Sequence, residues 1–157
     1  MTWQHLIEMA RLLAGQGALI TPGRPRQAML KKAVSAAYYA LFHALCYSNA
    51  NVLIGSSARA ARLPGWTRTY RALDHNAARD RLLQHHSGAS PAVQSFGTAF
   101  SVLQANRHRA DYDPGARFYR ANTVSLIDRA EDAIRAFLST DDQERRELAA
   151  AVLMRGR

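Results

Sequence analysis

The sequence predicts an all-α protein, a single-domain, up-and-down-type helical bundle of five to six helices. Apolar residues recur at spacings of three and four along most of the 157-residue chain, which is the period of a helix with one buried face. No stretch alternates apolar and polar residues over several positions, as a half-buried strand would. Glycine and proline gather in a few places and leave long uninterrupted segments between them. A chain of this length can bury a core without disulfides or metals.

The first predicted helix covers about residues 2–14, with Thr2 as its N-cap. Gly15 and Gly17 end it, and the segment Thr21–Pro25 is a linker. A second helix over residues 26–49 follows. It is apolar over so much of its circumference that we expect it to be the central helix of the bundle. Its expected core residues include Tyr38, Tyr39, Phe42 and Cys46.

The middle of the chain carries weaker signals. The apolar pattern fades over residues 51–65, where Gly55-Ser-Ser and Leu63-Pro-Gly65 predict a loop. A short helix over residues 67–75 follows, and residues 77–85 continue it or form a second one.

Three longer helices complete the chain. Ser90 and Pro91 are a cap and a first residue for a helix that runs to about Ala110, and residues 113–115 stop it. The next helix covers residues 116–138. The run from Thr140 to Gln143 has the capping-box pattern and starts a more polar last helix. We therefore divide the chain into a bundle over 1–139 and a C-terminal helical extension over 140–157. The buried face predicted for 116–138 consists of Tyr119, Thr123, Leu126, Ile127, Ala130, Ile134 and Phe137.

The formal net charge of +9 is almost entirely due to arginine. Arginine presents a planar fork that binds phosphate with two hydrogen bonds, so nucleic acid is the first candidate partner. The alternative is that the charge reflects arginine-rich codon usage and serves solubility. A single cysteine cannot form an internal disulfide, and no apolar run is long enough for a signal peptide or a membrane span. We therefore expect a cytoplasmic protein with no membrane partner.

Arg107 is the most unusual residue by position, because it continues an apolar helical stripe of Phe96, Phe100 and Leu103. A charge at such a position needs a partner or an interface. Asp111 lies one helical turn further on and can be that partner. One interpretation is a salt-bridged helix end that stabilises the bundle. The other is a site in which Arg107 binds phosphate while a neighbouring side chain transfers protons.

Three segments of the sequence resemble one known family. The run from Leu30 to Ala44, with its core Ala-Tyr-Tyr-Ala-Leu-Phe-His-Ala, is similar to the second helix of HEPN-domain proteins. The run Arg107–Tyr112 resembles the "arginine, then Ala-Asp-Tyr" element of a prokaryotic HEPN branch. The segment Tyr70–His75 between them also fits that branch. The resemblance covers about residues 5–138.

The resemblance implies an all-helical bundle that dimerises and is linked to RNA. Many members are metal-independent RNA endonucleases that use an arginine, a following polar residue and a histidine four to six residues after the arginine. Arg107 and His108 match the first two positions. This sequence has no histidine after His108, and Tyr112 stands near the place of the missing one. Other members lack the full motif and bind RNA or nucleotides for a partner, in several cases a nucleotidyltransferase.

Three hypotheses follow: an RNA-cleaving HEPN-like protein, a catalytically silent HEPN-like subunit, and a purely structural or interaction protein. The first two predict RNA as a partner and a homodimer, with a nucleotidyltransferase as a further candidate partner, and no metal or cofactor. The expected catalytic residues are Arg107, His108, Asp111 and Tyr112. The expected nucleic-acid-binding residues are Lys31, Lys32, Arg71 and Arg109.

Overall fold

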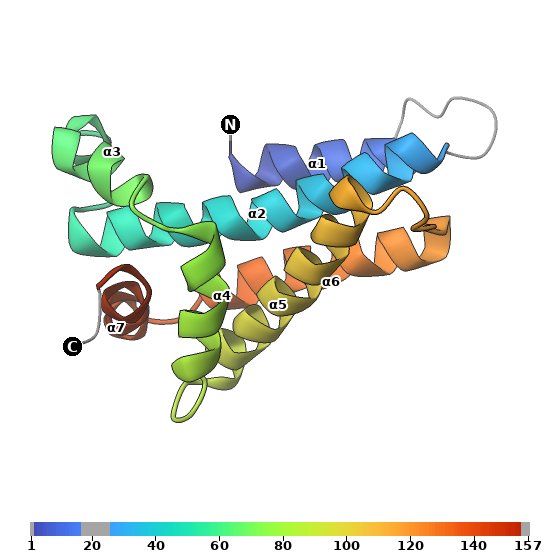
Figure 1. Cartoon of the computed structure of the whole chain (residues 1–157). Coiled ribbons are helices and arrows are strands. Elements are labelled where there is room, and N and C mark those ends of the chain that lie inside the picture. The colour runs from blue at the N-terminus through green and yellow to red at the C-terminus, as the bar shows by residue number, and fades with distance from the viewer. Residues whose placement is uncertain (1, 17–25, 155–157) are drawn as a thin grey trace.

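The computed structural model describes residues 2–16 and 26–154, and this part of the chain consists of helices and their connecting segments, without a strand. The all-α prediction is confirmed, but the described residues form seven α-helices instead of five or six (Figure 1). The predicted linker Thr21–Pro25 lies outside the described residues. The helices are α1 (Trp3–Leu13), α2 (Gln27–Leu53), α3 (Pro64–Tyr70), α4 (His75–Gln84), α5 (Pro91–Tyr112), α6 (Arg120–Leu138) and α7 (Asp142–Leu153), with a short 3-10 helix at Ala60–Arg62.

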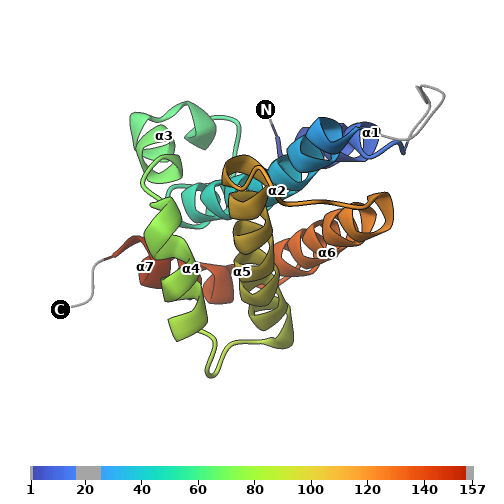
Figure 2. The same ribbon diagram turned by 45° about the vertical axis from the view of Figure 1, so that its right-hand side comes forward.

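The 27-residue helix α2 is the centre of the bundle, as its apolar circumference predicts. It packs against α1, α3, α5, α6 and α7. Figures 1 and 2 show it crossing the molecule, with α1 along one side and α5 and α6 on the other. Alanines on several faces of α2 let neighbouring helices approach closely while keeping a high helix propensity. The fully buried ones include Ala33, Ala37, Ala40 and Ala44.

The main core lies where α5 and α6 meet α2. Phe96 and Phe100 of α5 and Phe137 of α6 are fully buried, and the Phe96 and Phe137 rings are 4.4 Å apart. Leu148 and Val152 of α7 belong to the same core, so the described part of the C-terminal extension packs on the bundle. Cys46 is buried among these residues, as predicted, and burial raises the pKa of its thiol to about 12.

Two of the predicted N-caps are confirmed. The Thr2 side chain accepts a hydrogen bond from the backbone of His5, whose own side chain accepts one from Thr2. Ser90 accepts a hydrogen bond from the backbone of Val93, with Pro91 as the first helical residue. Such caps stabilise a helix end by about 1 kcal/mol each.

The predicted start of α6 is wrong by four residues. Gln27 of α2 binds both backbone groups of Phe118, donating to its carbonyl at 2.6 Å and accepting from its amide at 2.9 Å. Residues before Arg120 are therefore held out of the helix. Phe118 is buried in place of Tyr119, which is 68% exposed, so the expected burial of Tyr119 is wrong.

Other boundaries differ from prediction as well. Helix α2 continues to Leu53 and α3 begins at Pro64, so both ends of the predicted loop 51–65 are helical. The helix is interrupted between α3 and α4 because Asp74 caps a new helix. Its side chain accepts hydrogen bonds from the backbone amides of Asn76 and Ala77. The last helix is capped by Asp141 instead of Thr140, whose hydroxyl donates to the carbonyl of Phe137 at the end of α6. The cap at Asp74 therefore separates α4 from the predicted helix over 67–75, and the cap at Asp141 starts the last helix one residue later than predicted.

Candidate functional site

Arg107 lies on the face of α5 that packs against α2, with its side chain 21% exposed. Its Nη2 donates a hydrogen bond to the Tyr39 hydroxyl at 2.9 Å. Its Nε lies 3.0 Å from an Asp111 carboxylate oxygen. This contact is an ion pair without hydrogen-bond alignment, because Nε makes no hydrogen bond to the described residues. The pairing with Asp111 that the sequence predicted therefore forms.

Asp111 is itself held by the central helix. Its second carboxylate oxygen accepts a hydrogen bond from the Ser35 hydroxyl at 2.5 Å. Ser35, Asp111, Arg107 and Tyr39 thus form a continuous polar chain that connects α2 with α5. Charge-assisted hydrogen bonds of this kind fix orientation strongly, so the guanidinium is held in one position.

Three tyrosine rings surround the Arg107 guanidinium. Its central carbon lies 5.7 Å from the Tyr38 ring centroid, 5.4 Å from that of Tyr39 and 5.7 Å from that of Tyr112. These distances fall within the range of cation–π attraction. Burial lowers the pKa of Arg107, but the neighbouring tyrosines and Asp111 outweigh this effect and raise it. Arg107 is a permanent cation at this site.

His75, the first residue of α4, lies against two of these tyrosines, Tyr38 and Tyr39. Its Nδ1 is 3.0 Å from the Tyr38 hydroxyl, and its ring stacks on Phe42 at 3.7 Å with an interplanar angle of 7°. The Tyr39 ring, which also contacts Arg107, is 5.9 Å away. Gln104 of α5 donates a hydrogen bond to the His75 carbonyl at 3.0 Å. The fold therefore brings a histidine next to Arg107 from 32 positions earlier in the sequence.

Both partly buried histidines near this face have pKa values below the ordinary 6.5. Burial lowers the pKa of His75, and the charge of Arg107 lowers it further. Burial likewise lowers the pKa of His43, whose Nδ1 is 2.5 Å from the Tyr70 hydroxyl. Both imidazoles are therefore neutral at pH 7, and a neutral imidazole can accept a proton.

We expect the protein to lose stability on acidification because of these histidines. Their pKa values are lower in the folded than in the unfolded state, so the unfolded state binds more protons. The stability that His43 and His75 contribute is complete above about pH 6.5 and is lost as the pH falls below it. Melting temperatures measured by circular dichroism between pH 7 and pH 5 should fall more in the wild type than in the double variant His43→Gln, His75→Gln. An equal fall in both proteins would contradict this expectation.

The other predicted catalytic residues lie on the outer side of Arg107. Tyr112 is 64% exposed, and the exposed His108 ring packs on it at 4.9 Å. Arg107, Asp111 and Tyr112 therefore come together as predicted, while His108 reaches the group only through Tyr112.

The predicted nucleic-acid-binding residues do not form one cluster. Lys31 donates to the Asp113 carbonyl at 3.1 Å, and Arg109 lies over the Phe118 ring at 5.6 Å, so both also stabilise the end of α5. Lys32 is exposed on α2 nearby. Arg71 is exposed at the end of α3, on another part of the surface.

Sequence reasoning missed Ser35 and His75 as members of this site and assigned Tyr39 to the core alone. His75 had a local signal, because an aspartate directly before a helical segment acts as an N-cap and would have placed His75 on the first turn. No local signal could reveal that this turn meets Tyr38. The contact joins residues 37 positions apart.

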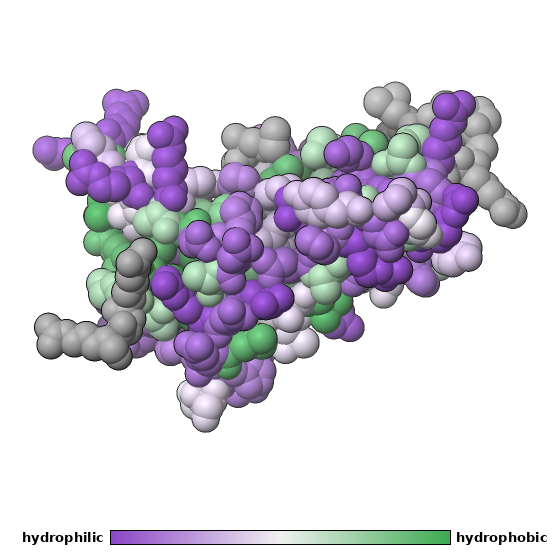
Figure 3. Space-filling model, in the orientation of Figure 1, coloured by the Kyte–Doolittle hydropathy of each residue, from purple (hydrophilic) through white to green (hydrophobic). Residues whose placement is uncertain are grey.

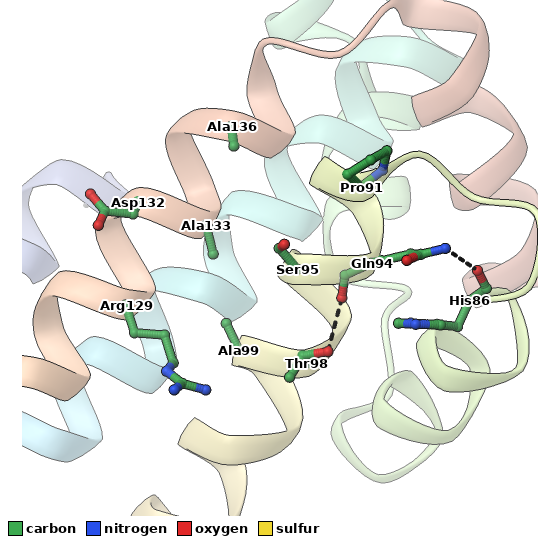
Figure 4. A pocket seen from close by; sticks show the side chains of 10 residues that line it. All are labelled: His86, Pro91, Gln94, Ser95, Thr98, Ala99, Arg129, Asp132, Ala133 and Ala136. Carbon is green, nitrogen blue, oxygen red and sulfur yellow. Dashed lines mark hydrogen bonds between the residues drawn. The ribbon is translucent and has the colours of Figure 1, made fainter.

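A groove of about 700 Å³ lies away from Arg107, along α5 and α6 (Figure 4). It has mostly small side chains along its floor, with Arg129 and Asp132 on one side and His86 on the other. Gln94 at its rim donates a hydrogen bond to the His86 carbonyl at 3.1 Å. Few charged side chains line this groove, so it offers fewer groups for acid–base catalysis or phosphate binding than the Arg107 site.

The comparisons with known proteins give no independent assignment. No protein-family model, no curated protein and no solved structure matches the chain. Within the described ranges, no helix is both long enough and apolar enough to cross a membrane. The fold and the site alone therefore define the class of this protein: an all-helical bundle with an arginine site between its central helix α2 and α5.

Proposed function

We propose that this protein is a HEPN-like RNA-binding protein that cleaves RNA without a metal ion, at a site formed by Arg107 and His75. The observation that carries the proposal is the position of Arg107. Tyr39 and Asp111 hold its guanidinium in place, and part of the side chain remains at the surface. A fixed, partly exposed cation is suited to binding a phosphate whose charge grows in a transition state.

His75 supports the proposed cleavage as a general base. It lies against the same Tyr39 ring as Arg107, and its pKa is lowered by burial and by Arg107. In the tautomer that donates from Nδ1 to the Tyr38 hydroxyl, Nε2 has a free lone pair. That atom takes the proton of an RNA 2′-hydroxyl, whose oxygen then attacks the phosphorus. The 5′-oxygen leaves with a proton supplied by His108 or Tyr112.

The charge distribution supports RNA as the partner. Lys31, Lys32 and Arg109 lie near the end of α5 that carries Arg107, and the whole chain has a net charge of +9. Phosphate contacts from such residues supply most of the affinity for nucleic acid and weaken as salt rises. A homodimer that places two Arg107 sites face to face, and a cytoplasmic location, belong to the same proposal.

A catalytically silent subunit is the second candidate, and one observation favours it. Arg107 already contacts Asp111 and Tyr39, so an incoming phosphate must compete with a carboxylate. In this case the protein binds RNA or a nucleotide for a partner such as a nucleotidyltransferase.

The experiment is RNA cleavage by the purified protein at physiological salt in the presence of EDTA. We expect cleavage by the wild type and its loss in His75→Gln. The matched control is His85→Gln, because His85 lies at the opposite end of α4 and its removal should leave cleavage unchanged. RNA binding without cleavage would reject the enzyme and favour the silent subunit. Failure to bind RNA at physiological salt would reject both.

A further inference from the structure

A second hollow, of about 580 Å³, lies where the start of α1 and helix α3 meet the middle of α2. Figures 1 and 2 show α3 and the beginning of α1 on the same side of α2. This volume is within the range of small-molecule sites. We call it the Trp66 hollow. Its aromatic side chains are Trp3, His43, Tyr47, Trp66 and Tyr70.

The aromatic rings of the Trp66 hollow are already arranged for stacking. Trp66 and Tyr70 stack at 5.3 Å with an interplanar angle of 24°, and the exposed Tyr47 ring meets Trp66 edge-on at 6.2 Å. The Trp66 indole nitrogen donates a hydrogen bond to the Asn51 side chain at 3.0 Å, which fixes the ring. A planar ligand can therefore stack here without ordering the protein first.

The hollow also offers a neutral polar group. The Tyr70 hydroxyl and Nδ1 of His43 are hydrogen-bonded. Burial raises the pKa of Tyr70 to about 12 and lowers that of His43, so both groups are uncharged at pH 7. Because Nδ1 of His43 is already hydrogen-bonded to Tyr70, its Nε2 is the ring nitrogen that can form one hydrogen bond with a ligand. A few polar groups among apolar walls are typical of sites that orient a ligand.

The charge around the hollow decides which planar ligand fits. The segment 55–73, which includes α3, carries four arginines and no acidic residue. Arg68 and Arg71 on and directly after α3 are exposed. Figure 3 shows hydrophilic side chains extending from the molecule over α3. These cations oppose a cationic ligand, which an aromatic cage could otherwise hold, and attract an anionic one.

We propose that the Trp66 hollow binds a nucleobase that carries a phosphate. The base stacks on the Trp66 ring with the Tyr47 ring against its edge, and the arginines of segment 55–73 outside the hollow attract the phosphate. A free nucleotide and an unpaired base of single-stranded RNA share this chemistry. Aromatic stacking accepts any base, because every base has a π face. The Trp66 hollow is separate from the Arg107 site, so the inference does not depend on cleavage at Arg107.

The test is isothermal titration of the whole protein at physiological salt with three probes: adenosine monophosphate, a short oligoadenylate and inorganic phosphate. We expect one or both base-containing probes to bind more tightly than inorganic phosphate. Trp66→Ala should weaken that binding by about tenfold or more, the size of one lost stacking contact. Binding of the mononucleotide identifies a free nucleotide as a ligand, and binding of the oligonucleotide alone identifies RNA.

Two further variants keep the result interpretable. Tyr47→Ala removes an exposed ring, so it should weaken binding without disturbing the fold even if Trp66→Ala unfolds. In the Arg107→Ala background, which lacks the proposed phosphate site, Trp66→Ala should still weaken mononucleotide binding by about tenfold, which separates this proposal from the proposed cleavage. The inference is overturned if inorganic phosphate binds as tightly as the base-containing probes, if none of the probes binds, or if Tyr47→Ala and a folded Trp66→Ala both bind like the wild type.

Discussion

Replacing Phe100 with alanine is expected to lower the free energy of unfolding by about 3–5 kcal/mol, the usual cost of removing a buried phenylalanine. Phe100 is fully buried. Its ring meets Tyr38 edge-on at 5.4 Å and lies 6.4 Å from Phe96, so it links α5 to the central helix. Chemical denaturation in urea, followed by circular dichroism, measures the change as a shift in the midpoint.

The matched control for this prediction is Tyr119→Ala. The sequence pattern places Tyr119 on the buried face of its helix, whereas the structure leaves it 68% exposed. Its removal should change stability by no more than about 0.5 kcal/mol, as is usual for surface positions. A loss at Tyr119 as large as that at Phe100 would mean that α6 is rotated relative to the structure described here.

Replacing Arg107 with alanine is expected to lower RNA cleavage by about 10²–10³-fold, the usual effect of removing one group that stabilises transition-state charge. Cleavage rates in EDTA at saturating RNA measure this effect. The chain should still fold cooperatively, because Arg107 is partly exposed and the core beneath it is unchanged. We expect a stability cost of about 1–3 kcal/mol, since Asp111 loses its charged partner.

A double variant separates the chemical role of Arg107 from its structural one. Changing Asp111 to asparagine in the Arg107→Ala background removes the unpaired charge, and Ser35 can still donate to the remaining oxygen. This variant should recover much of the lost stability and none of the lost cleavage. Recovery of cleavage together with stability would mean that Arg107 acts only as a structural ion pair between α2 and α5. Arg109→Ala, two positions further along α5 and on a different face of the helix, should reduce cleavage far less.

The helices themselves were predictable from the sequence because their signals are local. The period of the apolar residues identified α1, α2, α5 and α6, a capping pattern indicated α7, and the side chains of Thr2 and Ser90 marked two starts correctly. The pairing of Arg107 with Asp111 was also predictable, since residues four apart on a helix are neighbours. Each of these inferences needs only residues within about one or two turns of one another.

Tertiary contacts decided the features that the sequence could not. Gln27 holds the backbone of Phe118 across 91 positions and so delays the start of α6, which turns Tyr119 outward. Asp74 starts α4 at a point where the packing of α4 against α5 and α7 brings His75 onto Phe42 and Tyr38 of α2. The Trp66 hollow likewise combines side chains of three helices. Local periodicity determines that a segment is helical and which face is apolar, whereas the partner of that face depends on how distant segments pack. For that reason the sequence by itself determined the fold class and the Arg107–Asp111 pair, and only the three-dimensional structure placed a histidine beside them.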